Sequence, residues 1–223
     1  MTSKKWLVLT TLVAVAVYVV AWIGWSSEWA WVVEGDGAAL DATHRFGLAH
    51  PGWVTFWNLL CSVFSPLAFR VVVLGLIAWA MMRRRWRLAV FLFFSVELAG
   101  VVTELAKGVA DRPRPATALV YASSTSFPSG HALGTMAAVL ALLVVGLPLV
   151  RRSRRGWLIG VGIAIASAIV VAVGVGRVML SVHNPSDVVA GWALGYVWFV
   201  LCLPLLPRVR AADGTPATRD SEP

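Results

Sequence analysis

The sequence predicts an all-α, polytopic membrane bundle with six transmembrane helices and both termini cytoplasmic. Composition is the first reason, because 59% of the 223 residues are hydrophobic and only 13% are charged. Soluble domains carry about 25% charged residues. The mean hydropathy of +0.78 points the same way. The bilayer is therefore the expected solvent, and the number of apolar runs and the placement of the charges complete the argument.

Six runs approach the length of about 20 apolar residues that a helix needs to span the hydrocarbon core. They are residues 6–25, 59–82, 88–106, 132–150, 157–175 and 188–206. Lys4 and Lys5 precede the first run, as in a signal peptide. That run is longer than the usual apolar part of a signal peptide, about 7 to 15 residues, and no convincing small-x-small cleavage site follows it, which favours an uncleaved span.

Basic residues gather on one side of these spans. The formal net charge is +8, and six spans place four basic groups on the same side: residues 4–5, 83–87, 151–155 and 208–219. The positive-inside rule makes that side cytoplasmic. The positive charge thus indicates the orientation of the spans and does not indicate nucleic-acid binding. It predicts a multi-pass protein of the plasma (inner) membrane.

The spans form one domain, residues 1–207, followed by a polar tail, 208–223, that is expected to be disordered. The linkers on the inner side are short, whereas those on the outer side are long. The first outer linker, residues 26–52, is rich in tryptophan and histidine and is suited to the membrane interface. It is expected to form an interfacial lid or lipid entrance, or else an anchor without a chemical role.

Three polar clusters lie at the outer ends of spans three to six. They read Lys107-x6-Arg114-Pro115, Pro128-Ser129-Gly130-His131 and Arg177-x5-His183-x3-Asp187. Antiparallel spans bring these ends to one face, so the clusters are expected to form a single site on the outer side. Together they offer the residue types needed to bind and cleave a phosphate.

The first cluster supplies cations. The Lys107 ammonium and the planar guanidinium of Arg114 can neutralise and orient a phosphoryl group. Arg112 is expected to pair with Asp111 or to face solvent. Taken alone, the cluster is more typical of basic side chains that snorkel to the interface.

The second cluster marks the start of a helix. Ser129 is expected to cap it, so that its first amides face an anion with the helix dipole behind them. Gly130 allows a ligand to approach the backbone closely. His131 then lies beside the anion, where an imidazolium can donate a proton to a leaving oxygen.

The third cluster supplies a nucleophile. Arg177 can bind further phosphate oxygens, and His183 can attack phosphorus when its ring is neutral. Asp187 can accept the other ring N–H of His183 and fix its tautomer. This is the logic of a catalytic triad, with the acid on a separate loop.

These motifs resemble the type 2 phosphatidic acid phosphatase superfamily of integral membrane phosphatases, over the six-span layout of residues 6–206. That family has Lys-x6-Arg-Pro, Pro-Ser-Gly-His and Ser-Arg-x5-His-x3-Asp, and this chain departs from it at Gly176, where Ser is usual. The resemblance implies a metal-independent mechanism with a phosphohistidine at His183 and His131 as the acid. It also implies that Lys107, Arg114 and Arg177 bind the phosphate.

The predicted function is therefore a lipid phosphatase that acts at the outer face on a lipid phosphate or pyrophosphate. No metal or other cofactor is expected, because the nearby cations oppose a divalent ion. By family analogy the candidate substrates are undecaprenyl pyrophosphate, phosphatidylglycerol phosphate and phosphatidic acid, and all three stay open, as does the oligomeric state. The alternatives are a lipid phosphotransferase with the same phosphohistidine, and a non-catalytic binder or transporter of lipid phosphates.

Charged residues inside the spans are functional candidates by default. Glu104 is expected to pair with Lys107 or another basic residue of the site. Glu97 is more often a structural hydrogen-bonding group than a proton relay at such a position. Arg70 is expected to snorkel or to pair with a carboxylate such as Glu97.

Overall fold

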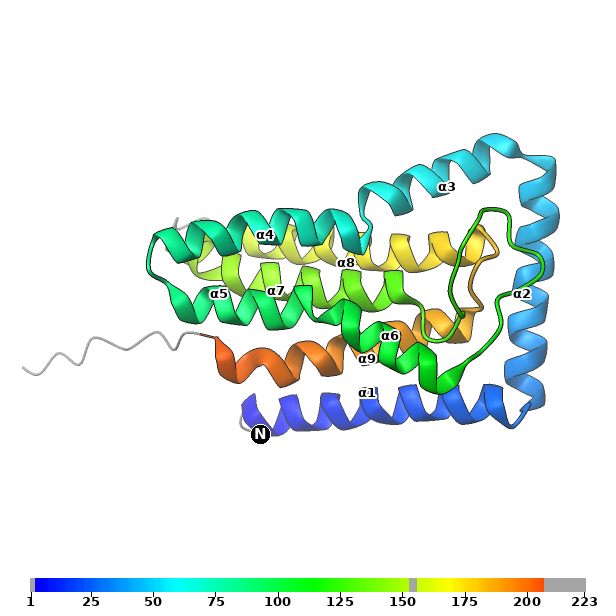
Figure 1. Ribbon diagram of the computed structural model, residues 1–223, viewed down its shortest axis with the longest axis horizontal. Coiled ribbons are helices and arrows are strands. Elements are labelled where there is room, and N and C mark those ends of the chain that lie inside the picture. The colour runs from blue at the N-terminus through cyan, green and yellow to red at the C-terminus, as the bar shows by residue number, and fades with distance from the viewer. Residues whose placement is uncertain (1–2, 153–155, 207–223) are drawn as a thin grey trace, which may run out of the picture.

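The computed structural model describes residues 3–152 and 156–206, and within them the chain is helical with no strand. Six helical segments are long and apolar enough to cross a membrane, and they run alongside one another in a bundle (Figure 1). They are Lys4–Ser26, Pro51–Met82, Trp86–Ala110, Gly130–Pro148, Trp157–Met179 and Pro185–Leu205. The predicted all-α class with six spans is confirmed, while the cytoplasmic placement of both termini stays a prediction. The predicted tail, residues 208–223, lies outside the described residues.

Apart from α2 (Ala30–Ala49) and the broken second span, the helices follow the predicted apolar runs closely. In chain order they are α1 (Ser3–Ser26), α2 (Ala30–Ala49), α3 (Pro51–Val63), α4 (Pro66–Met82), α5 (Trp86–Leu92), the π-helical turn η1 (Phe93–Glu97), α6 (Ala99–Ala110), α7 (Gly130–Arg152), α8 (Trp157–Met179), α9 (Pro185–Cys202) and the 3-10 turn η2 (Leu203–Leu205). Large apolar side chains such as Leu12, Leu67 and Leu105 are more than half exposed on the outside of the bundle. Such a surface suits lipid rather than water.

Helices α7 and α9 pack against each other most extensively, and α1 and α8 flank them. Two glycines of α9 permit this close approach. A Cβ added at Gly191 would lie 2.6 Å from the carbonyl oxygen of Ser129, and one at Gly195 would lie 2.6 Å from that of Leu133. The backbone amide of Ser129 donates to the carbonyl of Asp187 at 2.9 Å, which ties the start of α7 to the start of α9.

The second span is longer than predicted and is interrupted. It begins at Pro51 rather than at Leu59 and breaks between α3 and α4. Pro66 has no N–H to continue the ladder of α3, and the Ser65 hydroxyl caps the new helix by accepting from the amide of Ala68 at 3.2 Å. Both sides of the break are equally apolar, so hydropathy alone did not reveal it.

The first outer linker, residues 26–52, is largely helical. Its main part is α2, which lies across one end of the bundle (Figure 1). Val32, Asp36 and Leu40 are buried at intervals of four residues, so one face of α2 packs on the helix ends below it. The turn between α4 and α5, with Arg83, Arg84 and Arg85, lies at the opposite end of the bundle from α2 (Figure 1).

Candidate active site

All three predicted clusters meet beneath α2. The end of α6 carries Lys107, the start of α7 carries His131, and the end of α8 carries Arg177. The side chain of His131 lies close enough to interact electrostatically with Arg177, His183, Arg114 and Lys107. The structure therefore brings together cations and histidines that lie far apart in the sequence.

Lys107, in the last turn of α6, and Arg114, in the loop that follows α6, both bond to that loop. The buried ammonium of Lys107 donates to Ser124 Oγ at 2.7 Å and to the carbonyl of Thr125. The guanidinium of Arg114 donates to the carbonyl of Ser124 and, at 2.8 Å, to that of Val182. Within the described residues, loop 111–129 thus holds Lys107, and Glu104 forms no ion pair with Lys107 or with another basic residue of the site.

His183 is buried and faces both Arg114 and Asp187. Nη1 of Arg114 lies 3.2 Å from Nε2 of His183. Because a guanidinium only donates, Nε2 must accept, and the ring proton belongs on Nδ1. Nδ1 lies 3.5 Å from Oδ2 of Asp187, an electrostatic contact whose geometry falls short of a hydrogen bond. The lone pair of a neutral Nε2 is therefore directed at the cations of the site.

The pKa values outside the spans favour this neutral ring. Burial lowers the pKa of His183 to about 4; the carboxylate of Asp187 opposes that shift, and the cations of Arg177 and Arg114 add to it. At neutral pH the imidazole is uncharged. Burial also lowers the pKa of Arg114, but an arginine stays protonated in proteins.

Asp187 belongs to the first turn of α9 rather than to the preceding loop. It is fully buried, and its Oδ2 accepts from the amide of Asn184 at 2.9 Å, which completes the N-terminus of the helix. Its Oδ1 accepts from Nη1 of Arg112 at 2.6 Å. The carboxylate that faces Nδ1 of His183 is thus held by the backbone on one side and by an arginine on the other.

Arg112 corrects the prediction that it would pair with Asp111 or with solvent. It is 7% exposed and forms ion pairs with Asp187 and, at 3.0 Å, with Asp36 of α2. Asp36 also accepts from the backbone amide of Ser186 at 3.0 Å and from its hydroxyl. Arg112 therefore links α2 to the first turn of α9.

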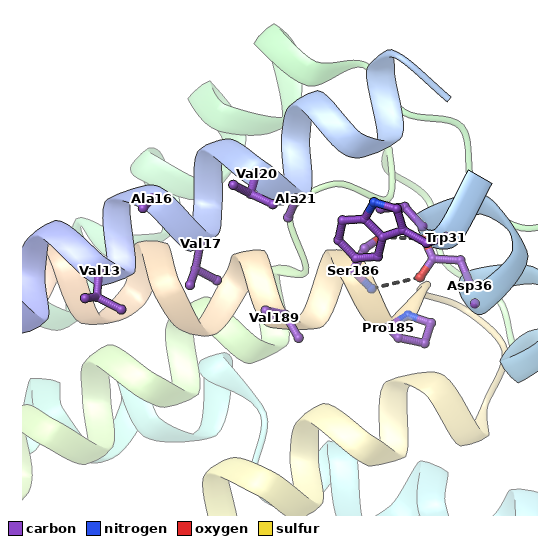
Figure 2. Close-up of a pocket in the computed structure, with 12 residues that line it drawn as sticks. Val13, Ala16, Val17, Val20, Ala21, Trp31, Asp36, Pro185, Ser186 and Val189 are labelled. Carbon is purple, nitrogen blue, oxygen red and sulfur yellow. Dashed lines mark hydrogen bonds between the residues drawn. The ribbon is translucent and has the colours of Figure 1, made fainter. Parts of the chain in front are cut away.

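An apolar groove of about 610 Å³ lies beside this link, between α1, α2 and α9. Figure 2 shows Val13, Val17 and Val189 along it and the hydrogen-bonded pair of Asp36 and Ser186 at its end. The polar network of the site thus borders directly on the apolar bundle.

The start of α7 differs from prediction in one respect. The Ser129 hydroxyl is buried but has no hydrogen-bond partner within the described residues, so it does not cap the helix. Nε of Arg177 is buried and likewise bonds no described group. Both groups are donors. Buried donors without protein partners are uncommon, and here they surround the start of a helix that suits an anion.

Gly176 has a packing role that explains the missing Ser. A Cβ at this position would lie 2.6 Å from Sγ of Cys61 and 2.9 Å from a ring carbon of Trp57. Helix α3 therefore packs on α8 at a distance that excludes a side chain at residue 176.

Within residues 3–152 and 156–206, no group of three or more His, Cys, Asp or Glu side chains is arranged to hold a metal ion. The predicted metal independence is a statement about turnover, so it stays a prediction that chelation must test.

Comparison with known sequences identifies a family. Residues 88–211 match the sequence model of the PAP2 superfamily. A solved transmembrane PAP2-type phosphatidylglycerolphosphate phosphatase from Bacillus subtilis has a similar fold, with a TM-score of 0.70 at 23% identity, over 87% of this chain and 94% of that one.

Curated relatives match over part of their length. Phosphatidylglycerophosphatase B of Bacillus subtilis is 39% identical over 95 residues, which are 41% of this chain and 44% of that protein. Lipid A 1-phosphatase of Rhizobium johnstonii is 26% identical over 70% of this chain and 62% of that protein. Decaprenylphosphoryl-5-phosphoribose phosphatase of Mycobacterium tuberculosis is 34% identical over 56% of this chain and 63% of that protein. Each alignment thus spans less than two thirds of the relative's own length.

Proposed function

Because the chain belongs to the PAP2 superfamily, we propose that it is a metal-independent membrane phosphatase that cleaves a lipid phosphate or pyrophosphate through a phosphohistidine on His183. One observation carries the proposal. A buried, neutral His183 directs the lone pair of Nε2 toward the guanidinium of Arg114, a group suited to phosphate oxygens. A nucleophile and a phosphate-binding cation thus stand side by side.

In the first step, Nε2 of His183 attacks phosphorus and forms a P–N bond, while the P–O bond to the leaving group breaks. Arg114, Arg177 and Lys107 neutralise the charge on the phosphoryl oxygens. The amide of Gly130 and the hydroxyl of Ser129 donate to the same oxygens. With the negatively charged phosphate bound beside it, the ring of His131 is protonated, and it gives this proton to the leaving oxygen, whose negative charge would otherwise oppose departure.

In the second step, water attacks the phosphohistidine. The neutral ring of His131 takes a proton from this water, the P–N bond breaks and inorganic phosphate leaves. Asp187 keeps the ring proton of His183 on Nδ1, so that Nε2 regains its lone pair. Both histidines return to their starting states, and the net reaction consumes one water.

The outer side of the membrane is the proposed location of the site. The site lies beneath α2, and the turn of Arg83 to Arg85 lies at the other end of the bundle (Figure 1). The positive-inside rule assigns that basic end to the cytoplasm. This assignment supports an outward-facing site and cytoplasmic termini.

Lipid phosphates are the proposed substrates. The site lies at helix ends within an apolar bundle, where a substrate with its tail in the bilayer arrives by lateral diffusion. The relatives named above act on phosphatidylglycerophosphate, lipid A and a decaprenyl-linked phosphoribose by their names, and all three classes carry a phosphate on a lipid.

The test is phosphate release by the purified protein from a panel of lipid phosphates and pyrophosphates. We expect release by the wild type, also in the presence of EDTA, and none by His183→Ala. Loss of activity with EDTA would contradict metal independence. Transfer of labelled phosphate to an alcohol instead of water would identify a phosphotransferase. Equal lipid binding without turnover in both proteins would identify a binder or transporter.

A further inference from the structure

An ion pair lies within the spans, outside the groups that bind phosphate. Nε of Arg70, on α4, donates to Oε2 of Glu97 at 3.0 Å, as the sequence suggested. Glu97 ends the π-helical turn η1, a type of turn that often marks functional positions. Its side chain is only 6% exposed, whereas that of Arg70 is 44% exposed.

This pair leaves hydrogen-bonding capacity unused. Only Nε of Arg70 bonds a described side chain, so Nη1 and Nη2 keep their donors. Oε1 of Glu97 is buried without a hydrogen-bond partner within the described residues. Unsatisfied polar groups at membrane depth are costly, so a cation with free donors needs acceptors there.

A pocket of about 180 Å³ surrounds the guanidinium, between α4, α6 and α7. Glycines keep it open. A Cβ at Gly134 would lie 2.8 Å from Cβ of Pro66, and one at Gly100 would lie 3.4 Å from Nη1 of Arg70. At about 30 Å³ for each water-sized group, the volume holds a linker of several heavy atoms but not a hydrocarbon chain.

The pocket extends inward from the phosphate site. Its wall includes Gly130, the first residue of α7, whose added Cβ would lie 2.9 Å from Thr103 and 3.9 Å from Cε of Lys107. Thr103 and Gly100, also in the wall, precede Lys107 by four and seven residues on the same span. At 1.5 Å per residue they lie about 6 and 10 Å deeper.

We propose that Arg70, oriented by Glu97, is a specificity-determining residue that donates hydrogen bonds to the ester carbonyl oxygens of a glycerolipid phosphate. This inference rests on the proposed function, since it assumes that the phosphate of the same lipid lies at His183. In a diacylglycerol phosphate the carbonyls follow the phosphate after a few bonds, at the depth of the pocket. In a polyprenyl phosphate hydrocarbon begins directly after the phosphate and offers Arg70 no acceptor.

The test compares two lipids that differ only in the carbonyls: dioleoyl phosphatidic acid and its dioleyl ether analogue. We expect the wild type to prefer the ester by about ten- to 150-fold in kcat/KM, the size of a hydrogen bond to a charged group. Arg70→Lys and the double variant Arg70→Met with Glu97→Gln should move this ratio toward one. The double variant leaves no buried carboxylate unpaired, which protects folding.

Arg83→Met, an exposed cation on the α4–α5 turn, is the matched control and should keep the wild-type ratio. An ester-to-ether ratio near one in the wild type, or a ratio unchanged in both Arg70 variants, would overturn the proposal. The proposal would also be overturned if the Arg70 variants kept the ester-to-ether ratio but no longer discriminated between the monophosphate and the pyrophosphate of one lipid.

Binding separates this proposal from the proposed function. Native mass spectrometry of the wild type with the ester and the ether lipid measures the same preference without turnover. Absence of phosphate release together with an Arg70-dependent preference for the ester would refute the phosphatase and retain the subsite. Phosphate release from both lipids without any preference would refute the subsite and retain the phosphatase.

Discussion

Replacing Arg112 by Lys tests whether the link between α2 and α9 supports catalysis. Arg112 spans two buried carboxylates, with Nη1 2.6 Å from Asp187 and Nη2 3.0 Å from Asp36. A lysine ammonium is a point charge and cannot bond both in this geometry. At least one hydrogen bond to a charged group is lost, worth about 1.5 to 3 kcal/mol.

If that loss falls on Asp187, the orientation of His183 in the transition state weakens. At 1.36 kcal/mol per factor of ten, kcat falls by about ten- to 150-fold. KM should change little, because Lys107, Arg114 and Arg177 still bind the phosphate. The assay is steady-state phosphate release from a lipid phosphate, with thermal unfolding measured on the same samples.

Arg87→Lys makes the same chemical change at an exposed position in the first turn of α5 and is the control. A kcat within about threefold of wild type in Arg112→Lys would refute the positioning role. A rise in KM at constant kcat would refute it as well, since it would assign Arg112 to substrate binding.

Two further predictions concern packing and pH. Gly176→Ser should lower the free energy of unfolding by about 1 to 3 kcal/mol, because its Cβ meets Cys61 Sγ at 2.6 Å. Adding Cys61→Ala should restore part of the lost stability, and an unchanged melting temperature in Gly176→Ser would contradict the packing argument. The pKa of His183 is about 4 when folded, against about 6.5 unfolded, so between these values only the unfolded chain binds the proton. The free energy of unfolding should therefore fall by about 3 kcal/mol as pH drops through this interval. His183→Gln should make the free energy of unfolding less dependent on pH in the same interval. An identical pH dependence in the wild type and in His183→Gln would contradict the assignment to His183.

Most of the fold was accessible from the sequence because membrane spans are defined by length and apolarity. The exceptions have local causes. The break before Pro66 lies between two apolar segments, so it left no trace in hydropathy. Helix α2 was predicted as an interfacial linker because its charged and aromatic residues suggest one. The spacing of Val32, Asp36 and Leu40 by four residues was the available sign of a packed helical face.

The sequence predicted which motifs form the candidate site, but it did not predict the contacts that support them. Motif spacing named His183 and Asp187, and the structure brings them within 3.5 Å of each other. The ion pair between Arg112 and Asp36 was missed because the two residues are 76 positions apart in sequence and a linker aspartate is usually solvated. Ser129 was expected to cap α7, yet its hydroxyl bonds no group in the part of the chain that the structure describes, a distinction that only the three-dimensional geometry makes.

The most direct test of the account is to look for the covalent intermediate. Wild-type protein is mixed with a lipid substrate labelled in its scissile phosphate, quenched in alkali within milliseconds and digested for peptide mass analysis. The account predicts an alkali-stable, acid-labile phosphate on His183, which is absent from His183→Ala. Turnover without any phosphopeptide, or a phosphate carried by a different residue, would contradict it.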